Sequence, residues 1–538
     1  MTDRERDPNE QQRRQTGPGE LFDALRDGRI SRRRFIIRAA ALGFSASAIN
    51  AFLIACGGGG GNTTTTTTTT AATTTTTTTA RTTTAPGAGL TTTTTTAGTA
   101  RTTTGTTGAA RTTGTTTRGT AAASRGGYDR NNPPAFTNAA AARQFSGQQL
   151  SYIGGQVGSD ADLDQILSRK FQEETGIRVN VTPGPEGANE RYAQYQRIFQ
   201  SSSADLDVMM LDVIWPGAFA QFLIDLNPRL GDLARQCYPS IIENNTVDGR
   251  LVGMPWFGDF GMLFYRTDLL QKYNISSPPR TWQELQQQAQ RIQEGERGGN
   301  PNFSGFVFQG AAYEGLTCNA LEWLASNGAG RFVENGQVTI NSPQGVQVMD
   351  LIKSFVGTIA PRGVTTFQEN ETVAAFTGGN AAFARNWPFM YALGQRAEAV
   401  RGKFDVAPLP AAQGQRNVGT LGGWQLGVSR FSRNQDAATE FVRYMCSPEV
   451  VTWRAVVASY VPLYPNVADD PDVVQANPYL RALANVERVT RPSRDLAENY
   501  NEGSTAIYQS VNQILTGGDT GQSLQRADQT LRRVVRRR

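Results

Sequence analysis

Four acidic residues are the clearest candidates for polar chemistry in this sequence: Asp160, Asp212, Asp259 and Glu314. Carboxylates can transfer protons, or they can accept short hydrogen bonds from a ligand. The chain contains no histidine, so serine–histidine–aspartate and cysteine–histidine catalysis are excluded. A carboxylate-based glycoside hydrolase needs two acids on either side of the bond that it breaks. No spacing in the sequence pairs two of the four in that way.

Three cysteines, Cys237, Cys318 and Cys446, are far apart in the sequence and show no C-x-x-C spacing. Cys237 and Cys318 could form a disulfide in an oxidising compartment, or all three could be buried as small apolar side chains. Both alternatives stay open at this point. Because histidine is absent, a zinc site would need four cysteines or carboxylates. We expect neither a metal nor a cofactor.

Alternating strand and helix patterns must position the first two acids. "LSYIGGQ" (150–156) is typical of a strand, and apolar residues at helical spacing follow Asp160 as far as Gly176. "IRVNVTP" indicates a second strand, residues 190–201 a second helix, and "DLDVMMLDVIWPG" a buried strand that contains Asp212. This order predicts a parallel sheet with helical crossovers. Ligands bind beyond the carboxyl ends of such strands, where Asp160 and Asp212 lie.

A second set of elements follows with different partners. Strand patterns occur in "LVGMPWFGDFGMLFYR", "FSGFVFQG", "NAAFARNWPF" and "GTLGGWQLGVSRF". Helix patterns occur in "TDLLQKYN", "TWQELQQQAQRIQE" with Thr281 as its cap, "GLTCNALEWLASNG" and "NQDAATEFVRYMCSP". A strand that leaves one sheet and a later strand that returns predict two α/β lobes joined by two or three crossovers. This architecture bends at a hinge.

The first 56 residues have the features of an export signal. Ser31-Arg32-Arg33-Arg34-Phe35-Ile36 resembles the twin-arginine motif. The apolar run 39–55 is too short for a membrane-spanning helix and suits a signal peptide. It ends in "LIAC", which resembles the lipobox of bacterial lipoproteins, so we predict a lipid on Cys56 after cleavage.

Residues 57–147 are rich in threonine, glycine and alanine, and we predict a disordered tether. The threonines are candidate sites for O-glycans, although a plain spacer explains them equally well. The net charge of +5 does not indicate nucleic-acid binding, because the basic excess lies in the first 130 residues and the rest of the chain is mildly acidic. We therefore expect no nucleic-acid partner.

Several segments of the exported part, in this order and spacing, resemble the extracellular solute-binding proteins of ABC sugar importers, and most of all the trehalose/maltose-binding proteins. They are "LDVIWPGAF", "YRTDLLQKY", "PPRTWQELQQQAQRIQEGERGGNPNFSGFVFQG", "YEGLTCN", "GNAAFARNWPF", "VAPLP" and "TLGGWQLGVS". The resemblance implies an α/β, two-lobed periplasmic-binding-protein-like fold of class II. We expect residues 148–259 and 388–458 in lobe 1, and residues 260–387 and 459–538 in lobe 2.

The same resemblance implies which residues contact the sugar. They are Asp160, Arg191 and Asp212 for hydroxyl groups, the crossover pair Phe257 and Asp259, the aromatic pair Trp387 and Phe389, the backbone of Gly423 with the platform Trp424, Arg491, which closes the site, and Glu314. Phe257 and Phe389 stand where the family often has tyrosine. Aromatic rings suit the C–H face of a pyranose, and charged side chains suit its hydroxyl groups.

The function implied is capture of a disaccharide of the trehalose or maltose type between two closing lobes, with no catalysis, and delivery to ABC permease subunits driven by an ATPase. We expect a monomer, on the outer face of the cell membrane and attached to it by lipid alone. The alternatives are another carbohydrate such as sucrose or a glucan oligosaccharide, or the hydrolase considered above. A polyamine or iron binder is disfavoured by Arg191 and Arg491, and a purely structural surface protein would not need two lobes.

Three of the proposed contacts also have ordinary structural explanations. Trp424 could belong to the core, Asp212 could cap a helix, and Arg491 could lie on the surface. The glycines beside Trp424 favour a ligand role, because they allow the backbone to approach closely. We expect Trp215 and Trp256 in the wall or core, and Trp282 and Trp323 in helix packing.

Overall fold

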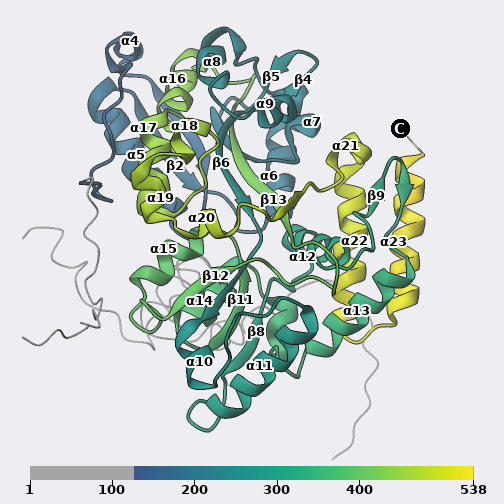
Figure 1. Cartoon of the computed structure of the whole chain (residues 1–538). Helices are drawn as coiled ribbons and strands as arrows, with labels where there is room; N and C mark the ends of the chain where they lie inside the picture. The colour runs from purple at the N-terminus through teal and green to yellow at the C-terminus, as the bar shows by residue number, and fades with distance from the viewer. Residues whose placement is uncertain (1–126, 537–538) are drawn as a thin grey trace, which may run out of the picture. The chain divides into compact units, whose positions relative to one another are not determined.

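The computed structural model describes residues 127–536, which form two α/β lobes, each built around its own sheet (Figure 1). The predicted signal peptide, Cys56 and most of the predicted tether lie outside the described residues. Within the described part, no helix is long and apolar enough to cross a membrane.

Lobe 1 contains a six-stranded sheet in the order β14-β13-β3-β1-β2, with β6 paired to β13. Its strands are β1 (Gln149–Gly154), β2 (Arg178–Pro183), β3 (Val208–Asp212), β6 (Met254–Phe260), β13 (Val418–Val428) and β14 (Glu487–Val489). β1 pairs in parallel with β2 and β3, as predicted, and β13 runs antiparallel to β3. All five residues of β3 are buried, which explains the continuous apolar run that ends at Asp212.

Three of the helices around this sheet, at residues 160–175, 188–200 and 435–445, match predicted helices. The helices around it are α5 (Asp160–Thr175), α6 (Ala188–Gln200), α7 (Pro216–Phe219), α8 (Asn227–Ala234), α9 (Pro239–Asn245), α16 (Gln435–Met445), α17 (Pro448–Ala458), α18 (Pro465–Ala468) and α19 (Pro471–Ala476). α5 ends at Gly176, whose φ of 77° only glycine adopts at little cost. Residues 155–159 join β1 to α5, so the first residue of α5, Asp160, lies just beyond the carboxyl end of β1.

Lobe 2 contains a four-stranded sheet in the order β12-β7-β11-β8. Its strands are β7 (Met262–Arg266), β8 (Ser304–Val307), β11 (Ala381–Asn386) and β12 (Phe404–Ala407). Its helices are α10 (Thr267–Lys272), α11 (Trp282–Glu296), α12 (Glu314–Ala325), α13 (Pro343–Phe355), α14 (Glu369–Thr377), α15 (Phe389–Arg396), α20 (Tyr479–Ala482), α22 (Tyr500–Leu515) and α23 (Thr520–Val535). The predicted cap of α11 is present, since Thr281 accepts a hydrogen bond from the backbone of Glu284.

Two paired strands carry the chain between the lobes. β6 continues through Gly261 into β7, and the N-terminal end of β13 pairs with the end of β6, Leu421 opposite Phe260. Gly261 donates a backbone hydrogen bond to the carbonyl oxygen of Thr420. The lobe boundary that we predicted at 259/260 is close to this point.

The other predicted lobe boundaries are wrong. β12 pairs with β7 in lobe 2, so the chain returns to lobe 1 between residues 407 and 418 and not at 388. Residues 459–476 stay with lobe 1, because Val467 and Val473 pack into its core, and β14 also belongs to the lobe 1 sheet through its pairing with β13. β12 has only four residues, so its sequence alone does not reveal its sheet.

The predicted end of the tether at residue 147 is also wrong. Residues 128–147 pack on lobe 1 through α4 (Ala139–Ala142) and the 3₁₀ turn η2 (Arg143–Phe145). The ring of Phe136 is buried and lies 5.6 Å from that of Phe171 and 5.3 Å from that of Tyr444, between centroids. This ring and hydrogen bonds with Tyr444, Trp453 and Glu174 of lobe 1 therefore order a segment whose average composition suggested disorder.

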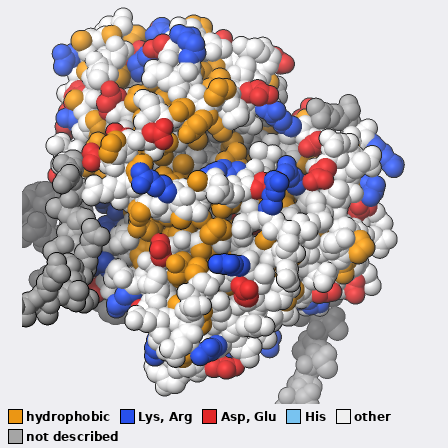
Figure 2. Space-filling view, in the orientation of Figure 1, with side chains coloured by type: hydrophobic (Ala, Val, Ile, Leu, Met, Phe, Trp, Pro, Cys, Tyr) orange, Lys and Arg blue, Asp and Glu red, His pale blue; other side chains and the backbone are white. Residues whose placement is uncertain are grey.

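All three cysteines of the described part are buried and unpaired, which supports the second of the two alternatives considered for them. Among residues 127–536 no group of three cysteine or acidic side chains could hold a metal ion. On the face shown in Figure 2, basic and acidic side chains are interspersed and form no large area of one sign.

Candidate functional site

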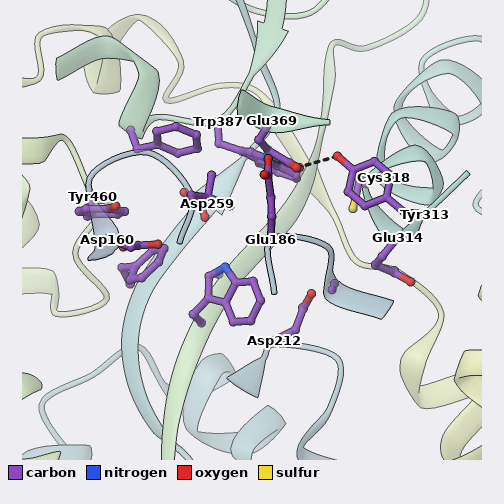
Figure 3. Close-up of a pocket in the computed structure, with 18 of the residues that line it drawn as sticks. Asp160, Glu186, Asp212, Asp259, Tyr313, Glu314, Cys318, Glu369, Trp387 and Tyr460 are labelled. Carbon is purple, nitrogen blue, oxygen red and sulfur yellow. Dashed lines mark hydrogen bonds between the residues drawn. The ribbon is translucent and has the colours of Figure 1, made fainter. Parts of the chain in front are cut away.

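A cavity of about 610 Å³, its opening to solvent included, lies between the two lobes and contains ten of the eleven predicted site residues. Figure 3 shows Asp160, Asp212, Asp259 and Glu369 around the same space. The cavity is lined by Val157, Asp160, Glu186, Ala188, Asp212, Phe257, Asp259, Tyr313, Glu314, Gly315, Cys318, Glu369, Trp387, Phe389, Gly422, Gly423, Trp424, Tyr460 and Arg491. The eleventh predicted residue, Arg191, does not line it.

Both lobes and their crossovers contribute to this lining. Lobe 1 supplies Asp160 at the start of α5 and Asp212 at the end of β3, and lobe 2 supplies Glu314 at the start of α12. The crossing strands supply Asp259 in β6 and Trp424 in β13. The position beyond the strand ends of lobe 1 is the one that the parallel sheet predicts.

Arg491 joins acids of both lobes. Its Nη2 donates to Asp212 Oδ1 at 2.6 Å, and its Nη1 donates to Glu314 Oε1 at 3.0 Å. All three side chains are buried. Burial raises the pKa of Glu314, and the positive charge of Arg491 opposes that rise. Ser504 on α22 also donates to Glu314, at 2.6 Å, so the carboxylate is held by several donors.

Asp160 is held by an arginine that we did not predict. Arg454 on α17 donates to Asp160 Oδ1 at 3.0 Å. The Arg454 guanidinium carbon lies 3.7 Å from the ring centre of Trp256 and 4.2 Å from that of Tyr460. Burial raises the pKa of Asp160, and Arg454 opposes this effect. Trp256 thus lies in the core of lobe 1, one of the two positions predicted for it, and it stacks on a buried cation.

Asp259 keeps a buried oxygen without a partner. It is 7% exposed, and its Oδ1 has no hydrogen-bond partner among the described residues. Burial raises the pKa of Asp259 well above its usual value, and the nearby charge of Asp160 adds to the rise. A buried acid without a partner destabilises the folded state unless a ligand supplies the missing contact.

The Trp387 indole is fixed on several sides. Its Nε1 donates to Glu369 Oε1 at 3.1 Å, and Tyr313 donates to Glu369 Oε2 at 2.7 Å (Figure 3). The guanidinium carbon of Arg385 lies 3.9 Å from the centre of the indole. Burial raises the pKa of Glu369, and the hydrogen bonds from Tyr313 and Trp387 oppose the rise. Glu369 and Tyr313 were both missed, since nothing in their local sequence marks them.

Trp424 lies between lobe 1 side chains and the cavity. Its ring is 5.8 Å from that of Trp215, edge to face, and 5.4 Å from the guanidinium carbon of Arg191. Arg191 donates to backbone carbonyls instead of pointing into the cavity, at 2.7 Å to Gly154 and 3.0 Å to Pro185. Arg191 therefore lies behind the Trp424 ring and does not make the contact with a sugar hydroxyl that we expected.

Gly423 must be glycine for two reasons. Its φ is +126°, and a Cβ there would lie 2.6 Å from the carbonyl oxygen of Phe257. The close approach of β13 to β6 brings the rings of Phe257 and Trp424 to the same cavity. The glycine before Trp424 in the sequence was thus a correct signal of close backbone approach.

Hydrogen bonds also join the lobes across the mouth of the cavity. Asn189 on α6 accepts from the backbone N–H of Glu314 at 2.8 Å. Asn370 on α14 donates its backbone N–H to Glu186 at 3.3 Å and accepts from the backbone of Gly158 at 3.4 Å. The described structure is thus a closed arrangement of the two lobes.

Comparison with known proteins matches residues 154–452 to the family described as bacterial extracellular solute-binding protein. A relative from Deinococcus radiodurans, named as a probable ABC transporter-binding protein, is 42% identical over 382 residues, which is 70% of this chain and 91% of the relative. The family match lies within the two-lobed part of the chain.

Solved structures match with the same coverage. The maltose-bound MalE3 protein of T. maritima is 34% identical, with a TM-score of 0.66 over 71% of this chain and 98% of that one. The GacH receptor of Streptomyces glaucescens, solved without ligand and with acarbose, is 22% identical, with a TM-score of 0.62 over 72% of this chain and 98% of that one. The predicted α/β two-lobed fold is confirmed.

Proposed function

This chain belongs to the family of bacterial extracellular solute-binding proteins, and we propose that its solute is a disaccharide of the trehalose or maltose type. A protein of this family binds its solute without transforming it, so the chain is a binding protein and not an enzyme. The disaccharide would lie in the cavity between the lobes and pass from there to the permease subunits of an ABC transporter, driven by its ATPase.

The observation that carries this proposal is the combination of aromatic faces with one unpartnered acid. Phe257, Trp387, Phe389 and Trp424 line the cavity and suit the C–H faces of sugar rings. Asp259 offers an oxygen that accepts from a hydroxyl group. Three other acids, Asp160, Asp212 and Glu314, already pair with arginines. The remaining two acids of the lining, Glu186 and Glu369, already accept hydrogen bonds from other residues of the chain. A neutral ligand with hydroxyl groups therefore fits better than a cation.

One relative supports the sugar class. T. maritima MalE3, whose structure was solved with maltose bound, is 34% identical to this chain. The more distant GacH receptor was solved with acarbose, and it supports the fold alone. Phenylalanine at 257 and 389 removes two hydroxyl groups that the family often has, which can shift the preference toward another carbohydrate such as sucrose or a glucan oligosaccharide.

Isothermal titration of the full chain against trehalose, maltose, sucrose and maltotriose tests the proposal. We expect the tightest binding for trehalose or maltose, at one site per chain. Equal or tighter binding of sucrose or maltotriose would replace the disaccharide assignment with the wider carbohydrate one. No binding of any of the four sugars would contradict the proposal.

We also propose that the protein is a monomer held on the outer face of the membrane by a lipid on Cys56. This part rests on the sequence alone, namely the twin arginines, the short apolar run and the "LIAC" ending. Because residues 128–147 pack on lobe 1, a tether would be attached to lobe 1 and would leave lobe 2 free to move.

A further inference from the structure

A buried ion pair lies behind the cavity, where the two crossing strands meet lobe 2. Arg385 on β11 donates from Nη2 to Glu322 Oε1 at 2.6 Å and from Nε to Glu322 Oε2 at 2.9 Å. Each side chain is 1% exposed. Neither residue lines the cavity. A buried ion pair seldom stabilises a fold more than apolar side chains of the same size would. Stability alone therefore does not explain this pair, and its contacts indicate what else it does.

One side of the pair faces the ligand cavity through Trp387. The guanidinium of Arg385 stacks on the Trp387 indole at 3.9 Å, while Glu369 holds the indole Nε1. The edge of the same indole approaches Gly422, where an added Cβ would be 3.3 Å from it. Trp387 therefore has little freedom to turn, and it presents its ring to the cavity before any ligand arrives.

The other side of the pair contacts both crossing strands. Glu322 Oε1 accepts a hydrogen bond from the backbone N–H of Thr420, in β13, at 3.1 Å. A Cβ added to Gly261, between β6 and β7, would lie 1.8 Å from Glu322 Oε1 and 2.6 Å from Arg385 Nη2. Any rotation of the lobes about these strands must therefore move them against the Glu322 carboxylate.

We propose that the Arg385–Glu322 pair is a positioning element that fixes the Trp387 ring in the cavity and couples it to the two crossing strands, so that it sets sugar affinity and lobe closure without touching the sugar. This inference rests on the proposed function, because it takes Trp387 as a contact of the sugar. The pair acts by preorganisation: a ring that is already in place loses less conformational freedom on binding.

Arg385→Lys tests the positioning role, because lysine keeps the charge near Glu322 but loses the planar stack on the indole. The double variant Arg385→Met/Glu322→Gln removes both charges, so that no unpaired charge is left in the core. Arg266→Lys is the matched control: Arg266 on β7 forms a two-bond pair with Asp268, at 2.7 and 2.6 Å, in the same sheet but away from the cavity lining.

Two readouts test the cavity, and a third tests closure. The first is maltose and trehalose affinity by titration, which we expect to fall about tenfold or more in both Arg385 variants and to stay within about twofold in the control. The second is ¹⁹F NMR of the sugar-free full chain labelled with 5-fluorotryptophan, with the Trp387 signal among the seven tryptophans assigned by Trp387→Phe. We expect that signal to shift or broaden in Arg385→Lys and to stay in place in Arg266→Lys.

Lobe closure is measured by the distance between two spin labels, one in place of Arg169 on α5 of lobe 1 and one in place of Gln287 on α11 of lobe 2. Gly261→Ala, which drives a methyl group into the Glu322 carboxylate, should reduce the closed fraction at a given sugar concentration as Arg385→Lys does. Gly402→Ala, where no atom lies within 4 Å of the added Cβ, should not.

Unchanged affinity, an unmoved Trp387 signal or an unchanged closed fraction would each overturn the corresponding part of the proposal. If the unaltered chain binds no sugar, the proposed function fails instead. In that case the ¹⁹F signal of the sugar-free protein still decides whether Arg385 positions Trp387.

Discussion

Arg491 donates two hydrogen bonds to the carboxylate of Asp212, from Nη2 to Oδ1 at 2.6 Å and from Nη1 to Oδ2 at 3.3 Å. The same guanidinium reaches Glu314 of lobe 2, so one cation neutralises an acid from each lobe across the closed cavity. An arginine is suited to this position because its planar donors serve two carboxylates at once. Closure therefore brings together charges that would repel each other without Arg491.

Arg491→Ala should lower both sugar affinity and stability, because it leaves two buried carboxylates without a counter-charge. Removing one partner of a buried ion pair costs about 3–5 kcal/mol. We expect at least a tenfold loss in titrations and a clear fall in melting temperature. Arg491→Lys should recover part of both. Arg494→Ala is the control, since Arg494 forms an exposed pair with Glu243 at 3.1 Å; an equal effect of the two alanine variants would contradict a special role for Arg491.

Asp259 should contribute to binding at the expense of stability. Asp259→Ala removes the free acceptor, and we expect sugar affinity to fall at least tenfold. Asp259→Asn removes the buried charge but keeps polar atoms, so the sugar-free protein should melt at a higher temperature at pH 7.5 than the unaltered chain. Asp405→Asn, at an exposed position of β12, should change neither quantity. Unaltered affinity of Asp259→Ala would remove Asp259 from the site.

Gly423→Ala should damage the site by moving β13 away from β6, because the new methyl group would lie 2.6 Å from the Phe257 oxygen. The positive φ alone costs about 1–2 kcal/mol for a residue with a side chain. Gly414→Ala controls for that cost, since Gly414 has a φ of +81° and open space around it. We expect a tenfold or greater loss of affinity in Gly423→Ala only. Equal stability losses and intact binding in both variants would mean that the close approach is unimportant.

Cys56→Ala should abolish lipid attachment. The variant should appear in the soluble fraction of the culture or remain as an uncleaved precursor, whereas the unaltered protein should partition into detergent. Ser45→Ala, in the same apolar run but away from the cleavage point, is a suitable control. Normal membrane retention of Cys56→Ala would rule out the lipobox interpretation.

The sequence allows Asp160 and Asp212 to be placed because a repeating strand–helix order puts their elements side by side, and the parallel sheet then gathers the strand ends at one edge. Arg454 and Arg385 could not be placed in this way. Arg454 is 294 residues from Asp160 in the chain, and Arg385 is 63 residues from Glu322. A local sequence pattern does not predict contacts between residues so far apart. Arg191 shows the reverse error: its residue type suited the sugar, but α6 turns the side chain to the backbone behind Trp424.

The lobe boundaries failed for a related physical reason. A strand as short as β12 has no sequence pattern that assigns it to one of the two sheets. Only its pairing with β7 decides to which lobe it belongs. Pairing energy is a tertiary property, so hydrophobic pattern alone does not report it. Glu369 was missed for the same reason, because its two donors, Tyr313 and Trp387, come from other elements.

The buried carboxyl group of Asp164 should make the stability of the protein depend on pH. Asp164 on α5 is fully buried, and it accepts a hydrogen bond from the backbone of Gly155 at 2.9 Å. Burial, with a further contribution from the charge of Asp160, raises the pKa of Asp164 to about 7. The folded protein therefore keeps a proton on this group at a pH where the unfolded chain has lost it.

The sign of the effect follows from proton linkage. Between about pH 4, the ordinary value for an aspartate, and pH 7 the folded state binds more protons at Asp164 than the unfolded state, so stability falls as the pH rises through this window. Asp164→Asn removes this contribution and keeps an acceptor for Gly155. We expect the variant to melt several degrees higher than the unaltered chain at pH 7.5 and at nearly the same temperature at pH 4.5, measured without sugar. Asp162→Asn, two residues away on the exposed face of α5, should give no such pH-dependent difference. A constant offset between Asp164→Asn and the unaltered chain at both pH values would show that packing, and not the proton, governs the change.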